Sequence, residues 1–121
     1  MELFTVDMNI EDIRDYCLSF EGVVEKTPFG KFAARFDSVL VFYVCDHMFC
    51  MFDMDDFVGV TVKGDPQRIA ELIETRSYCQ SHRNMSKKYW IQLNPGGDIS
   101  DNEILNLIKR SYEIVKAKYS R

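Results

Sequence analysis

The chain has 121 residues, of which 46% are hydrophobic and 28% are charged, and its formal net charge is −4. This length fits one domain over residues 1–121 that buries a hydrophobic core without metal or disulfide staples, and the composition excludes a disordered chain. No apolar run approaches the roughly 18 residues that span a bilayer, and the acidic N-terminus lacks the features of a signal peptide. We therefore expect a soluble, cytoplasmic monomer that does not associate with membranes.

The first predicted element is a helix over residues 10–19. Asn9 is typical of an N-cap, and acidic residues follow in the first turn, where the helix dipole favours them. Apolar residues recur three or four positions apart and give the helix one hydrophobic face. Gly22 ends the helix, and a short extended piece and a turn follow.

Three strands are predicted in the middle of the chain. Residues 38–44 and 48–54 are rich in β-branched and aromatic residues. Asp46 and His47 between them are expected to form the turn of a hairpin. Residues 57–63 alternate between two faces after an acidic turn. Because the links are short, the three strands are expected to pair consecutively and antiparallel.

A second helix is predicted over residues 66–75, with Asp65 as its cap. Pro66 takes the first helical position, where its missing N–H is not needed. Ile69, Leu72 and Ile73 have the spacing of a buried helix face. An irregular basic stretch follows, and then residues 89–93 predict a further strand.

The last predicted element is a helix over residues 101–118. Ser100 and Glu103 have the spacing of a capping box, and apolar residues repeat at helical spacing as far as Val115. No linker is long enough to divide the chain. The order of elements, in which strands are grouped between flanking helices, indicates the α+β class.

A series of short motifs resembles the MmcQ/YjbR family in both order and spacing. These motifs are Pro28-Phe29-Gly30, a tight turn before Met48-Phe49, the V-x-hydrophobic-K-x-x-P pattern of Val60, Val62, Lys63 and Pro66, the basic segment ending in Lys87-Lys88-Tyr89-Trp90, and Ser111-Tyr112-Glu113-Ile114-Val115. The resemblance extends from about residue 10 to about residue 118. It implies a fold similar to the frataxin-like (CyaY-like) sandwich, in which helices pack on one face of an antiparallel sheet.

The resemblance also implies a function, because the family is described as DNA-binding by analogy with a double-wing arrangement. One turn departs from the family pattern. Cys45-Asp46-His47 stands where members usually carry Gly and Lys, which weakens the expectation of a phosphate contact at that turn.

A nucleic-acid site is predicted around residues 76–88, which hold four basic residues, one histidine and no acid. Lysine and arginine meet phosphates, whereas aromatic and amide groups contact bases. Binding of DNA through so few cations is expected to be weak and of low sequence specificity. The alternative is a solvated basic loop, with Trp90 in the core beside Ile91 and Leu93. The predicted site residues are Lys63, Arg76, His82, Arg83, Asn84, Lys87, Lys88 and Trp90.

A rival hypothesis is a protein-interaction or small-ligand module that uses the sheet face left open by the helices. A concave aromatic pocket lined by Phe42, Phe49 or Phe52 would favour it. An enzyme is not expected, and no cofactor is predicted, because the two histidines lie in a turn and a polar loop and no catalytic motif is present.

Metal binding and disulfides are not expected either. Asp53, Asp55 and Asp56 could hold a hard cation, but an acidic hairpin turn explains them equally well. The four cysteines are expected to be reduced and buried. A bridge between Cys45 and Cys50 across the hairpin is the alternative.

Overall fold

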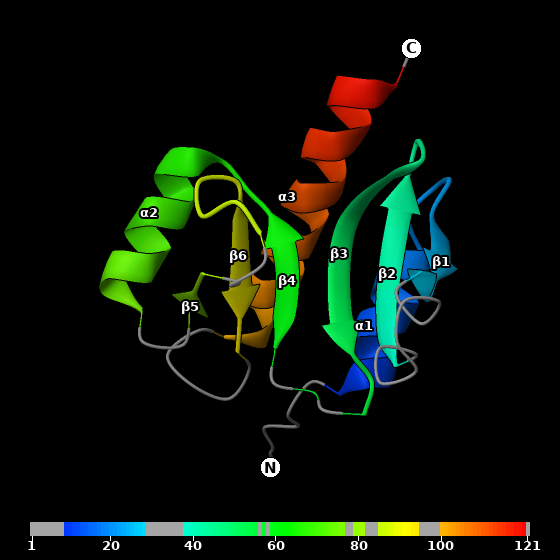
Figure 1. The fold of residues 1–121 in the computed structure, drawn as a ribbon, viewed down its shortest axis with the longest axis horizontal. Helices are drawn as coiled ribbons and strands as arrows, with labels where there is room; N and C mark the ends of the chain where they lie inside the picture. Colours follow the sequence, from blue (N-terminus) through cyan, green and yellow to red (C-terminus); the bar gives the residue numbers. More distant parts are fainter. Residues whose placement is uncertain are drawn as a thin grey trace.

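A computed structural model describes residues 9–28, 38–55, 57, 59–76, 79–81, 85–94 and 100–120. The described part contains an antiparallel sheet of six strands in the order β1-β2-β3-β4-β6-β5 (Figure 1). The strands are β1 (Val24–Lys26), β2 (Val39–Val44), β3 (His47–Asp53), β4 (Val60–Lys63), β5 (Cys79–Gln80) and β6 (Trp90–Leu93), and the helices are α1 (Ile10–Leu18), α2 (Pro66–Thr75) and α3 (Asp101–Tyr119). The predicted α+β class and the consecutive antiparallel pairing of β2, β3 and β4 are confirmed.

The three helices lie on one face of this sheet. Figure 1 shows α1 and α3 behind the strands, with α2 beside β5 and β6. One hydrophobic cluster joins all the layers: Ile13 of α1, Leu72 of α2 and Ile108 of α3 pack with alternate residues of the strands. Burial of this apolar face is the main force that holds the helices on the sheet.

The predicted helix boundaries hold within one residue, because local capping sets them. The Asn9 side chain accepts a hydrogen bond from the Asp12 N–H, and the Asp12 carboxylate accepts one from the Asn9 N–H. The Ser100 hydroxyl oxygen likewise accepts from the Glu103 N–H. The predicted cap at Asp65 is wrong in one respect: its side chain makes no hydrogen bond to the helix.

The hairpin between β2 and β3 turns one residue earlier than predicted. Cys45 and Asp46 form the two-residue loop, with φ values of 52° and 65°. A tight hairpin loop of this kind requires positive φ at both positions, which is why glycine is usual in such turns. His47 is therefore a strand residue, and its ring stacks on Tyr119 of α3 at a centroid distance of 3.4 Å.

Strand β3 contains a bulge that the sequence did not indicate. Phe42 pairs with Cys50, but the next residue, Tyr43, pairs with Met48, so Phe49 is an extra residue. A bulge places two consecutive side chains on the same face of a strand. Phe49 and Cys50 accordingly both belong to the core cluster beneath the helices.

Two other strand predictions need correction. β4 begins at Val60, three residues later than predicted, and Phe57 lies outside it, packing edge-on against Phe52. The basic stretch predicted to be irregular contains β5, whose two residues pair with Leu93 and Gln92 of β6. Such a short edge strand has too few residues for periodicity to reveal it.

The face of the sheet opposite the helices is not bare. Val41, Met51 and Thr61 form one cross-strand row on that face, and their exposed fractions are 0%, 7% and 3%. The centre of this face is therefore not accessible. A broad open sheet face, as the rival hypothesis requires, is not available there.

The cysteines differ in part from the prediction. All four are reduced, and Cys17, Cys50 and Cys79 are buried, but Cys45 is exposed in the hairpin turn. A bridge from Cys45 to Cys50 does not fit, because Cys50 lies opposite Phe42 in the ladder. Within the described residues, the helices are too short or too polar to cross a bilayer.

Candidate nucleic-acid interface

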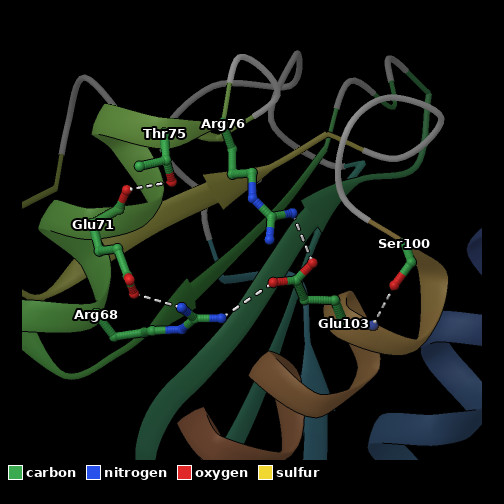
Figure 2. Close-up of polar contacts among 6 residues, drawn as sticks. All are labelled: Arg68, Glu71, Thr75, Arg76, Ser100 and Glu103. Carbon is green, nitrogen blue, oxygen red and sulfur yellow. Dashed lines mark hydrogen bonds and ion pairs between the residues drawn. The ribbon is translucent and has the colours of Figure 1, made fainter.

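Arg76, a predicted phosphate contact, belongs to a network of ion pairs within the fold. Its guanidinium group donates to the Glu103 carboxylate at 2.9 Å, and Arg68 donates to the other oxygen of that carboxylate at 3.1 Å (Figure 2). Glu103 thus joins the first turn and the end of α2 to the first turn of α3. The carboxylate of Glu103 is used by these arginines, and the predicted capping box is only half formed.

Lys87 and Lys88 are exposed, as expected for a contact surface. The ammonium group of Lys88 lies over the Tyr89 ring, 5.5 Å from its centroid, and 42% of the Tyr89 surface is exposed. Three other predicted contact residues, His82, Arg83 and Asn84, lie outside the described residues.

Trp90 is not a core residue. It is half-buried on the sheet face opposite the helices, whereas its neighbour Ile91 is in the core. Trp90 pairs with Lys63 across β4 and β6, and the Lys63 ammonium lies 5.9 Å from the centre of the indole ring. The predicted residues Lys63 and Trp90 are thus brought together by strand pairing.

A hollow of about 330 Å³ lies beside this pair, where β4 ends and α2 begins. Figure 1 shows this end of β4 next to the start of α2 and near the second half of α3. Its lining comes from β4, α2 and α3, the link between β4 and α2, and the residue before β6: Lys63, Gly64, Asp65, Pro66, Tyr89, Ile114 and Lys118. We call the group Lys63, Lys87, Lys88, Tyr89, Trp90 and Lys118 the Tyr89–Trp90 surface.

The Tyr89–Trp90 surface has an excess of positive charge. Within the described part of the chain, no carboxylate lies within ion-pair distance of Lys63, Lys87, Lys88 or Lys118. The nearby acid, Asp65, accepts two hydrogen bonds from Arg110 at 3.0 and 3.1 Å. This hydrogen bonding holds the pKa of the Asp65 carboxyl below its ordinary value, so the acid stays ionised and compensated.

Lys118 is the contributor that sequence reasoning missed. It lies 55 positions after Lys63, in the last turn of α3. Helical spacing puts it four positions after Ile114, on the same face of the helix, but only the packing of α3 under β4 brings it to Lys63. Arg76, in contrast, stands at the opposite end of α2, about 15 Å from the start of that ten-residue helix.

The aromatic pocket that would favour a ligand-binding module is not formed by the residues named for it. Phe42, Phe49 and Phe52 have exposed fractions of 0%, 0% and 3% and fill the core between the sheet and the helices. In the acidic turn, the Asp53 carboxylate accepts hydrogen bonds from the Ser38 hydroxyl and the Asp55 N–H. Asp56 lies outside the described residues, among which no cluster of three metal-binding side chains is found.

Comparison with known proteins decides the family. The YjbR family model matches residues 18–114, which is most of the chain. The chain belongs to the YjbR family. No curated protein matches it.

Two crystal structures share the fold of this YjbR-family chain. A Deinococcus radiodurans protein with a DUF419 domain is 24% identical, with a TM-score of 0.78 over 90% of this chain and 79% of that chain. A Pseudomonas syringae protein is 21% identical, with a TM-score of 0.71 over 89% of this chain and 99% of that chain. At these identities the likeness shows the fold alone.

Proposed function

We propose that this protein is a non-enzymatic DNA-binding protein that uses the Tyr89–Trp90 surface. The observation that carries the proposal is that lysine ammonium groups lie over the exposed ring of Tyr89 and the half-buried ring of Trp90. In the described part of the chain these lysines, Lys88 and Lys63, have no carboxylate partner. Lysine ammonium groups neutralise phosphates, and aromatic rings stack on bases whatever the sequence. The surface offers no nucleophile paired with a base.

The arrangement of the lysines supports contact with a strand backbone. Lys87 and Lys88 precede β6, Lys63 is the last residue of β4, and Lys118 lies in the last turn of α3, so the cations come from three separate parts of the fold. Few lysines take part, and the protein is acidic overall. We therefore expect weak binding that is steeply dependent on salt and only slightly dependent on sequence.

The test is equilibrium binding of labelled duplex and single-stranded DNA, measured by fluorescence anisotropy over a range of salt concentrations. If four lysines each neutralise one phosphate, the log–log slope of affinity against salt is about −3 to −4. Absence of binding to both forms at low salt would remove the proposal. A slope near zero would also count against it, because binding would then not depend on phosphate contacts.

A further inference from the structure

The hollow beside the Tyr89–Trp90 surface combines walls of two chemical kinds. Ile114, Pro66 and the ring of Tyr89 supply apolar and aromatic surface, and Lys63 and Lys118 supply positive charge. Its volume of about 330 Å³ is at the lower end of the range for small-molecule sites. A nucleotide needs both kinds of wall side by side, because its planar base packs against apolar and aromatic surface and its phosphate needs positive charge.

The charge of the hollow favours an anion. The Lys63 and Lys118 ammonium groups contact aromatic rings at 5.9 and 5.4 Å, and within the described residues neither has a carboxylate partner. Asp65 also lines the hollow, but its carboxylate is held by Arg110 in a two-bond contact. Its negative charge is therefore largely compensated, and the charge of Lys118 remains for a ligand.

We propose that the hollow binds one unstacked nucleotide, with the phosphate at Lys118 and the base against Tyr89. This inference rests on the proposed function and makes it more specific. A base inside a duplex is stacked on both faces and cannot enter a hollow of this size without leaving the helix. The protein should consequently bind single-stranded DNA more tightly than duplex DNA, and a single nucleotide should compete for part of the site.

The experiment uses the full chain, labelled with ¹⁵N, and three probes: thymidine 5′-monophosphate, thymidine and inorganic phosphate. We expect the monophosphate to shift the amide signals of Gly64, Tyr89 and Lys118 and to bind more tightly than either fragment. Lys118→Ala should weaken this binding about tenfold, because a charge-assisted contact to phosphate is lost. Lys109→Ala is the matched control, since Lys109 is an exposed lysine of the same helix that does not line the hollow.

The outcomes separate this inference from the proposed function. If the monophosphate binds no better than inorganic phosphate, or if Lys118→Ala leaves its affinity unchanged, the nucleotide site is wrong even when oligonucleotides still bind. Equal affinity for duplex and single strands would overturn it as well. If the monophosphate binds at the hollow but no oligonucleotide binds at low salt, the nucleotide site stands and DNA binding falls.

Discussion

The hydroxyl group of Ser111 in α3 lies between Lys63 of β4 and Phe49 of β3 and forms hydrogen bonds with the backbones of both strands. Its oxygen accepts a hydrogen bond from the Lys63 N–H at 2.9 Å, and its proton is donated to the Phe49 carbonyl. The direct pairing of β3 with β4 stops one position earlier, at Cys50 and Val62. The Ser111 side chain thus replaces the next pair of hydrogen bonds between β3 and β4 at the bulge. The strand residue that it bonds, Lys63, also belongs to the Tyr89–Trp90 surface.

Replacement of Ser111 with alanine is expected to destabilise the protein by about 1–3 kcal/mol. The change would leave the Lys63 N–H and the Phe49 carbonyl without their partner, at a site where Ser111 itself is 0% exposed. The measurement is urea unfolding followed by circular dichroism. Ser120→Ala is the control, because Ser120 is exposed, and it should change the unfolding free energy by less than about 0.5 kcal/mol. Equal effects of the two changes would contradict the bridging role.

Replacement of Arg76 with alanine is expected to lower stability without changing DNA binding. Arg76 is held by Glu103, and it stands at the far end of α2 from the hollow. The free energy of unfolding should fall by about 1 kcal/mol, because the ion pair between Arg76 and Glu103 is partly exposed to solvent. Unfolding and the salt dependence of DNA binding are measured on the same variant. A salt slope flatter by one unit would show that Arg76 contacts phosphate after all.

Replacement of both Lys87 and Lys88 with alanine is expected to flatten the salt slope on single-stranded DNA by about 1.4 units. Both lysines are exposed, so the unfolding free energy should hardly change. The slope is measured by anisotropy titration against single-stranded DNA. Lys26→Ala is the control, since Lys26 lies on β1 at the opposite edge of the sheet from β6 and β5. A full slope in the double variant would place the contact surface elsewhere.

The parts of the fold that local sequence controls could be predicted. Asn9 and Ser100 cap their helices through residues three positions away, and this spacing is visible in the chain. The bulge at Phe49 could not be predicted, because the group that bonds the Phe49 carbonyl there is the hydroxyl of Ser111, 62 positions later in the chain. A long-range hydrogen bond leaves no periodic pattern in the sequence.

The same distinction applies to the candidate site. Lys87, Lys88 and Trp90 are close in sequence, so the basic and aromatic segment is recognisable from the sequence alone. Arg76 was assigned to that segment because Glu103, 27 positions away, gives no local sign of pairing with it. Lys118 was missed for the converse reason, since only the packing of α3 brings it to the hollow.

Cys45 is expected to be the one thiol that reacts rapidly in the native protein. It is exposed in the hairpin turn, whereas Cys17, Cys50 and Cys79 are 0%, 0% and 4% exposed. Burial also raises the pKa of the Cys50 thiol, which lowers its thiolate content. Titration with a thiol reagent should count one fast group in buffer and four in concentrated denaturant. Cys45→Ser should abolish the fast phase, and a second fast thiol would show that the core opens readily.

The ion pair between Asp65 and Arg110 is expected to make a small contribution to stability that disappears in acid. Hydrogen bonds from Arg110 lower the pKa of Asp65 below its ordinary value of 3.8, so the folded state favours the ionised carboxylate. The contribution is therefore complete above that ordinary value and is lost as the pH falls through the lower pKa of the folded state.

Comparison of the wild type with Arg110→Gln measures this contribution directly. Both side chains of the pair are about half exposed, so solvent screening limits the difference in unfolding free energy to about 0.2–1 kcal/mol at neutral pH. Urea unfolding at a series of pH values should show a constant difference near neutrality that shrinks below the ordinary pKa of Asp65. Lys109→Gln, on the neighbouring exposed position, should show no such trend. A difference that persists unchanged into strong acid would mean that Arg110 stabilises the fold by packing and not by holding Asp65 beside the hollow.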